Sequence, residues 1–284
     1  MNDLYSHIIK EIFLSQEPYL VHDFLDVRNN NGSYNFCFNT CKKVFDETIR
    51  VLMKMKYNGE IVLPKELKFD KDHMIYGQDI INKSIWLQKN KIINENGVVK
   101  LFASVYNIFN GEVVKREHTF ENRDRILLIP IDGLKALANG LSTFSVVIVL
   151  QEKDDDGIFQ TKSIFIFNPI RKEIFSFGLG EGCKYNGRKI VSDHMYSLNK
   201  KDWQIIFVND SFENNVDLNK FVKSSDELLV LSSIFDAFAT LATTHNDFIL
   251  YNANVEYLPL IEFMCKTGNF ELNIENGVYK IVKK

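Results

Sequence analysis

The chain has 284 residues, of which 45% are hydrophobic and 25% are charged, and its formal net charge is −3. The hydrophobic fraction is too high for a disordered chain, and the near balance of charge excludes a protein that binds nucleic acid mainly through phosphate attraction. The longest apolar run, residues 144–150 interrupted only by Ser145, is far shorter than the ~20 residues of a membrane helix. Composition therefore predicts a globular protein with a sizeable core and neither a nucleic-acid nor a membrane partner.

The cysteines and the first residues predict a reducing, cytoplasmic setting. The close pair Cys37 and Cys41 has no second pair or histidine cluster that would complete a zinc site, and Cys183 and Cys265 are too scattered for a disulfide framework. The opening stretch MNDLYSHIIKEIF mixes acidic and basic residues and contains no small-residue cleavage site, so we do not expect a secretory signal.

The first half of the chain alternates predicted helices and strands. Apolar residues three and four apart predict helices at 3–14 and 40–56. A short strand is expected at 60–63, closed by Pro64. Two β-rich runs within 98–120 flank Asn110-Gly111, a dipeptide typical of a two-residue hairpin turn.

The middle of the chain is rich in strands. A buried strand at 126–129, a turn at 130–133 and a short helix at 134–138 come first, and further strands follow up to another hairpin-type dipeptide, Asn186-Gly187. Beyond it we expect, in order, a strand at 203–210, a helix at 232–243, a strand from 248, a helix ending near 267–269 and a hairpin around 276–277.

This order of elements predicts layered sheets and helices of the α/β (α+β) class, not a doubly wound Rossmann sheet. The polar stretch VSDHMYSLNKKD predicts a boundary near 190–200. We therefore expect an N-terminal part, residues 1–190, and a smaller C-terminal part, residues 191–284.

An ordered series of motifs lies within residues 126–190: Pro130-Ile131-Asp132-Gly133, Gly140, Asn168-Pro169-Ile170, Gly180-Glu181-Gly182 and Asn186-Gly187-Arg188-Lys189-Ile190. The series resembles the inositol monophosphatase family of magnesium-dependent, lithium-sensitive sugar phosphatases. The resemblance implies that family's fold, a layered αβαβα sandwich of the fructose bisphosphatase-like type. It continues more thinly at 57–66, 232–236, 247–248 and 267–269, whereas residues 67–120 have no counterpart and read as an insertion.

The resemblance implies a phosphomonoesterase whose Mg²⁺ ions are held by carboxylates. The family's Gly-Glu-Glu corresponds here to a segment in which Lys65 replaces the first glutamate and Glu66 retains the second. In the central Asp-Pro-Ile-Asp-Gly-Thr, Ile129 replaces the first aspartate and Asp132 retains the second. The last ligand, an aspartate after tryptophan, falls at Glu256 when counted back from Gly268.

Three further positions extend this comparison. The family's threonine after Asp-Gly is Leu134, and its helix aspartate falls at about Lys42. Counting forward from Asp247 moves the last ligand to about Leu258. The glutamate that would contact substrate falls at about Tyr251.

These replacements argue against a two-metal site. A lysine offers no lone pair to a metal and repels it, and isoleucine cannot ligate at all. Asp132 and Glu66, with Glu256, could hold one weakly bound Mg²⁺. Two structural interpretations stay open beside this one: Asp132 fits the N-cap of the helix at 134–138, and Lys65 fits a surface lysine.

Two functional hypotheses follow. In the first, the protein is a degenerate member of the family whose turn at Gly133 and Leu134 binds phosphate through backbone N–H groups, helped by Lys65 and Lys42. In the second, it is an active Mg²⁺-dependent phosphatase with Asp132 and Glu66 as catalytic residues. Either hypothesis implies a small phosphorylated molecule or an inorganic anion as ligand, and the resemblance further implies a homodimer.

Overall fold

A computed structural model describes residues 3–27, 29, 32–69, 72–90, 94–95, 97–101, 105–107, 112–114, 124–190, 204–208, 228–243, 247–251, 257–275 and 278–283. The predicted boundary at 190–200, the turn at 110–111 and the turn at 276–277 lie outside these residues.

The larger of two main sheets is formed by strands from the first two thirds of the chain. They are β1 (Gly59–Val62), β4 (Asn94–Glu95), β5 (Val98–Leu101), β8 (Asp124–Asp132), β9 (Ser145–Lys153), β10 (Phe159–Asn168), β11 (Glu173–Gly178), β12 (Gly182–Tyr185) and β13 (Arg188–Lys189). Their order is β13-β12-β11-β10-β9-β8-β1-β5-β4. Within this sheet β1 and β8 are parallel, and the other neighbours are antiparallel.

The second sheet comes from the C-terminal part. It contains β14 (Gln204–Val208), β15 (Leu228–Leu231), β16 (Asp247–Tyr251), β17 (Phe270–Glu275) and β18 (Val278–Lys283). The order is β15-β14-β16-β18-β17, with β14 parallel to both of its neighbours.

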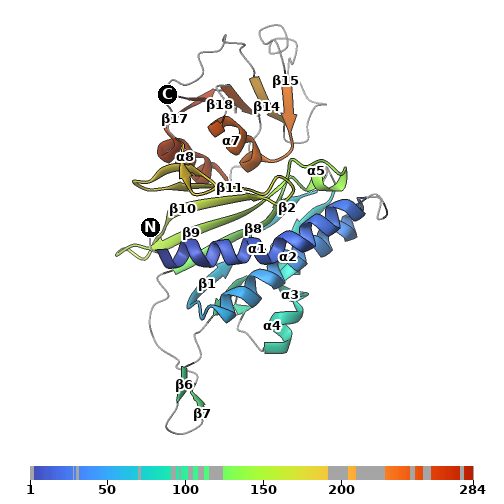
Figure 1. The fold of residues 1–284 in the computed structure, drawn as a ribbon, viewed down its shortest axis with the longest axis vertical. Coiled ribbons are helices and arrows are strands. Elements are labelled where there is room, and N and C mark those ends of the chain that lie inside the picture. Colours follow the sequence, from blue (N-terminus) through green and yellow to red (C-terminus); the bar gives the residue numbers. More distant parts are fainter. Residues whose placement is uncertain are drawn as a thin grey trace.

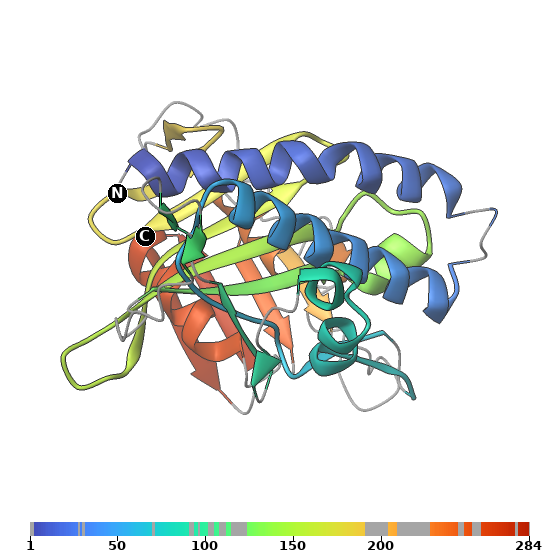
Figure 2. The ribbon, with the colours of Figure 1, turned by 90° about the horizontal axis from the view of Figure 1, so that it is seen from below.

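Helices cover both faces of the larger sheet (Figure 1). On one face lie the long helices α1 (Asp3–Asp26) and α2 (Tyr34–Lys54), which run side by side across the strands in both views (Figure 2). On the other face α7 (Ile234–Thr243) and α8 (Leu258–Gly268) lie between the two sheets. The layered α/β class that the sequence predicts is confirmed.

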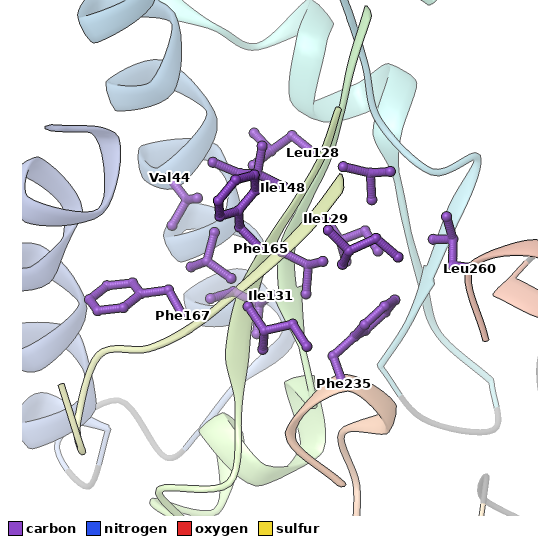
Figure 3. Packing of buried hydrophobic residues seen from close by; sticks show 14 of the residues in the cluster. Val44, Leu128, Ile129, Ile131, Ile148, Phe165, Phe167, Phe235 and Leu260 are labelled. Atoms are coloured by element: carbon purple, nitrogen blue, oxygen red, sulfur yellow. The ribbon is translucent and has the colours of Figure 1, made fainter. Parts of the chain in front are cut away.

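The central strands are buried on both faces because both faces are covered. On one side, Val44 of α2 packs near Ile148 and Phe165; on the other, Ile129 and Ile131 lie toward Phe235 of α7 and Leu260 of α8 (Figure 3). All of these side chains belong to a single hydrophobic cluster. That cluster therefore joins the N-terminal and C-terminal parts of the chain.

The first helix is longer than its apolar spacing predicts. It continues from residue 14 through Pro18 to Asp26. A proline inside a helix leaves the carbonyl four residues earlier without its usual donor, and here Pro18 and Leu14 both lie on the exposed side. The other side of this second half is held to α2 by polar contacts, among them Gln16 to Thr48 at 2.7 Å.

The segment that reads as an insertion adds small elements beside α2, with contacts to Tyr34, Phe38 and Asp46 of that helix. β2 (Glu66–Lys68) and β3 (Met74–Tyr76) form a two-stranded ribbon, and α3 (Gly77–Asn82) and α4 (Ile85–Asn90) pack against α2. Strands β6 (Val105–Asn107) and β7 (Glu112–Val114) pair antiparallel, which confirms strands on both sides of the predicted turn.

Candidate functional site

The candidate site lies where β1 and β8 end. Because these two strands are parallel neighbours, the residues that follow them reach the same edge of the sheet. Asp132 is the last residue of β8, and Lys65 and Glu66 come shortly after β1. Lys65 is exposed, whereas Glu66 is partly buried in β2 and pairs through its backbone with Tyr76 of β3.

Asp132 is 8% exposed and is bonded to the first turn of α7. Its Oδ2 accepts a hydrogen bond from the Ser233 hydroxyl at 2.6 Å and another from the Phe235 amide at 2.9 Å. A carboxylate at a helix N-terminus satisfies backbone donors that have no intrahelical acceptor, and it complements the helix dipole. This residue thus holds α7 to the end of β8.

The prediction that Asp132 caps the helix at 134–138 is wrong. That helix, α5 (Leu134–Ala138), begins after Gly133 and has no side-chain cap. The aspartate is the final residue of an extended strand, and its side chain points across to α7, more than 100 residues later in the chain. Gly133 then turns the chain with φ +85°, and an added Cβ would lie 2.9 Å from the Thr143 carbonyl oxygen and 3.0 Å from the Ser233 Cβ.

Burial raises the pKa of Asp132 from 3.8 to about 6. The hydrogen bonds from Ser233 and Phe235 favour the ionised form, and the nearby Asp236 carboxylate opposes it. Removal from water is the largest of these effects. The side chain therefore gains a proton at a pH where an ordinary aspartate would still be charged.

Ser233 links the two carboxylates. Its hydroxyl donates to Asp132 and accepts from the Asp236 amide at 2.9 Å, which is the N-cap geometry for α7. Ser145 of β9 lies 3.4 Å from the same hydroxyl. The start of α7 is thus bonded to both β8 and β9.

Asp236 is held in a second polar cluster. Its Oδ1 accepts a hydrogen bond from the side-chain amide of Asn168 at 3.0 Å and another from the Arg171 guanidinium, which also binds Glu173 at 2.6 Å. The same side-chain amide of Asn168 donates to the Ser142 carbonyl oxygen at 2.8 Å. Its oxygen accepts from the backbone N–H of Arg171 at 3.0 Å. Burial raises the pKa of Asp236, and Arg171 counteracts this effect. The Asn168-Pro169 motif thus anchors α7 to the end of β10.

Sequence reasoning found Asp132 and the Asn168 motif but missed Ser233, Asp236 and Arg171 as parts of the same network. One available signal was the spacing of Ser233 and Asp236, serine followed three residues later by an acidic residue before an apolar run. Nothing in the local sequence points to Arg171.

The position of the first family aspartate lies inside the core. Ile129 is fully buried and faces Phe235 and Leu260 (Figure 3). Lys42, the second lysine expected to add positive charge, lies on α2 and forms an ion pair with Asp46 at 3.0 Å. Its charge is therefore neutralised within the helix.

The residues that the structure describes do not fit a two-metal centre. Among them no three histidine, cysteine, aspartate or glutamate side chains gather as metal ligands. The Asp132 oxygen that faces α7 already accepts two hydrogen bonds, and Ile129 supplies no ligand. Glu256, the third expected carboxylate, lies outside the described residues.

No family model and no curated protein matches the sequence. Solved structures do match over nearly the whole chain. The extragenic suppressor protein suhB from Bartonella henselae is 12% identical, with a TM-score of 0.61 over 99% of this chain and 94% of that one. An extragenic suppressor from Pyrococcus furiosus is also 12% identical, with a TM-score of 0.58 over 100% and 97%.

Inositol monophosphatase II from Staphylococcus aureus is 11% identical to the chain, with a TM-score of 0.55 over 99% of this chain and 90% of that one. At identities this low, the structural similarity establishes the fold and nothing more. The chain therefore has the fold of inositol monophosphatase and suhB proteins, as its motifs predicted. No helix among the described residues is long and apolar enough to cross a membrane.

Proposed function

We propose that the chain is a divergent member of the inositol monophosphatase family that binds a small phosphorylated molecule or inorganic phosphate without hydrolysing it through two metals. One observation carries the proposal. Asp132, the retained aspartate of the central motif, is bonded to the start of α7. The second carboxylate ligand that the family motif would place beside it is replaced by Ile129, a residue of the core. A carboxylate used in this way positions a helix. Without a neighbouring carboxylate at position 129, Asp132 is poorly placed to hold a metal ion.

The anion would bind at the sheet edge beyond β1 and β8. Gly133, in the αL conformation, directly precedes α5, and the first amides of that helix would be the donors to the anion. Lys65 follows β1 at the same edge and carries an exposed side chain. Backbone amides and a lysine together can hold phosphate without a cation.

Calorimetric titration with inorganic phosphate and with inositol monophosphate tests the binding. Lys65→Ala should weaken phosphate binding by about fivefold or more, because it removes a charge-assisted hydrogen bond of roughly 1 kcal/mol or above. Lys10→Ala removes an exposed lysine from α1 and is the matched control, expected to leave the affinity unchanged. Equal affinity in the two variants would contradict the proposal.

A phosphatase assay tests the absence of hydrolysis. The substrates are inositol phosphates, fructose bisphosphate and nucleotide bisphosphates, each with and without Mg²⁺ and lithium. We expect no turnover above background under any condition. Mg²⁺-dependent turnover that disappears in Asp132→Asn would establish the active phosphatase instead.

A further inference from the structure

Strand β17 forms one edge of the C-terminal sheet. It ends the strand order β15-β14-β16-β18-β17, and β18 is its one partner strand among the described residues (Figure 1). With six residues it is longer than the other edge strands, since β15 has four and β4 and β13 have two each. In an antiparallel strand, every second residue directs its N–H and C=O groups away from the partner strand. The outer side of β17 therefore presents a row of backbone donors and acceptors.

The sequence of β17 lacks most of the features that keep an edge strand from pairing with another chain. Edge strands are commonly protected by lysine, by proline, by a bulge or by being very short. β17 contains neither lysine nor proline, and its register with β18 runs without a bulge from Phe270 to Glu275. By contrast, the edge strand β13 of the larger sheet consists of Arg188 and Lys189. β17 is thus able to accept a further strand.

The apolar face of β17 extends beyond the core. Phe270, Leu272 and Ile274 share one face because side chains alternate along a strand. Phe270 is 4% exposed and packs against Phe238 of α7, Leu272 is partly buried, and Ile274 is 49% exposed. A strand added to this edge would cover the Ile274 side chain and remove its apolar surface from water.

The sequence of β17 is complementary to itself in the antiparallel direction. A two-fold axis at Leu272 places this residue opposite its own copy and Phe270 opposite Ile274 of the second copy. On the other face, Glu271 then lies opposite Asn273 of the second copy, and both positions are exposed. Apolar residues therefore meet apolar residues, and the charge of Glu271 meets a neutral amide.

Other registers are less favourable. An axis at Glu271 or at Asn273 would place two glutamates directly opposite each other, which destabilises a strand pair. An axis between two residues would place apolar and polar side chains opposite each other on the same face. The pattern of β17 thus favours pairing about Leu272.

We propose that β17 is a dimerisation strand, which pairs antiparallel with β17 of a second copy of this chain and joins the two C-terminal sheets into one. The backbone groups of the outer edge supply the hydrogen bonds, and the apolar face supplies the buried contact. A single pair of strands is smaller than a standard interface, so we expect a weak dimer with a Kd on the order of 10 µM.

Analytical ultracentrifugation of the full chain from about 1 to 200 µM measures the association. The wild type should shift from monomer to dimer over this range. Ile274→Lys should raise the Kd by about tenfold or more, because it places a lysine on the edge strand. Ile158→Lys is the matched control, since Ile158 lies between β9 and β10 and is 59% exposed, and it should leave the Kd unchanged. A wild type that stays monomeric, or equal dimerisation of the two variants, overturns the proposal.

Helix α1 offers the competing surface. Leu14, Pro18 and Leu25 are exposed on its outer side, and Leu25 is 71% exposed. Leu25→Lys should leave the Kd unchanged when β17 forms the dimer. Dissociation in Leu25→Lys but not in Ile274→Lys would place the interface on α1 and overturn the proposal.

Position 273 tests the register without altering the apolar face. Asn273→Lys places a lysine opposite Glu271 of the second copy and should lower the Kd by about threefold or more, whereas Asn273→Glu should raise it by a similar factor. Both effects should shrink in about 0.5 M NaCl, because these positions are exposed.

Equal effects of the two substitutions at 273, or effects in the reverse order, would contradict pairing about Leu272. Circular dichroism establishes whether each variant folds. Should Ile274→Lys fail to fold, the two variants at the exposed position 273 decide the matter, because neither changes a core contact. An unchanged Kd in both would then overturn the proposal.

Discussion

At the scale of single residues, Asp132 makes the stability of the protein depend on pH. Its pKa is 3.8 when unperturbed and about 6 in the fold, so the folded state takes up a proton at a higher pH than the unfolded state does. The stability contributed by this uptake is complete below pH 4 and is lost as the pH rises through 6. This difference in pKa corresponds to about 3 kcal/mol in the free energy of unfolding between acidic and neutral pH. Asp236, whose pKa is also raised, acts in the same direction.

Replacing Asp132 by asparagine should therefore flatten the pH dependence. The amide oxygen can still accept from Ser233 and Phe235 but does not titrate. Urea unfolding of the wild type and Asp132→Asn at half-unit steps from pH 4 to 7 should show stability curves that converge at the acidic end, where both side chains are neutral. Near neutral pH, where only the wild type buries a charge, the wild type should be less stable than the variant by up to about 3 kcal/mol. A parallel pair of curves would show that the pKa of Asp132 is the same in the folded and the unfolded state, and would contradict this account.

Ile129 offers a second residue-level prediction, in which the missing aspartate is put back. Ile129→Asp would bury a carboxylate among Phe235, Leu260 and other apolar side chains, and we expect a loss of about 3–5 kcal/mol in the free energy of unfolding. Ile129→Val, which removes only a methylene, should lose about 1 kcal/mol. Denaturant unfolding measures both. An Ile129→Asp protein as stable as the valine variant would mean that the site opens to water or a cation.

At the scale of elements, two serine caps allow a direct comparison. Ser233 caps α7 with a buried hydroxyl that also bonds Asp132, whereas the Ser33 hydroxyl caps α2 with a single 3.3 Å bond from the Phe36 amide. Ser233→Ala should cost about 2 kcal/mol, because it also removes a donor from a buried carboxylate. Ser33→Ala should cost about 0.5–1 kcal/mol. Thermal or urea unfolding that ranks the two in the reverse order would contradict this account of α7.

The sequence predicted elements best where apolar residues repeat regularly. Residues 134–138 form the expected helix, and the strands from 145 to 178 lie where their continuous apolar runs place them. The turn at Asn186-Gly187 is also confirmed, since both residues have positive φ. The second half of α1 was missed because Gln16 and Asp23 are polar yet buried. Their partners, Thr48 and Thr40, come from another helix, so no local pattern reveals them.

The site was predictable only in part for the same reason. The motif around Asp132 identifies the residue and the fold, because local turn geometry requires that sequence. Its role depends on Ser233, and the role of Asn168 depends on Asp236, which lie 101 and 68 residues apart from them in the chain. Contacts of this kind exist only after the two sheets have packed on α7.

At the scale of the whole molecule, α7 and α8 join both sheets through one core, so we expect the described parts to unfold together. Phe235→Ala removes a fully buried ring that packs against Tyr257 at a centroid distance of 5.7 Å and against the β8 side chains. It should cost about 3–5 kcal/mol. Native-state hydrogen exchange should then show equal losses of protection in β9 and β16. Loss confined to the C-terminal sheet would instead indicate two independent units divided near 190–200.

The contact between Asp132 and α7 bears on how divergent chains of this fold should be compared. An aspartate at the end of β8 can be required by the assembly of the molecule even when no reaction depends on it. A lineage that stopped using such a protein as a catalyst would still be expected to keep that aspartate, while the neighbouring ligand positions drifted freely. Presence of this one residue is therefore weak grounds for assigning an activity, and the positions beside it, at 65 and 129, are the more informative ones to inspect.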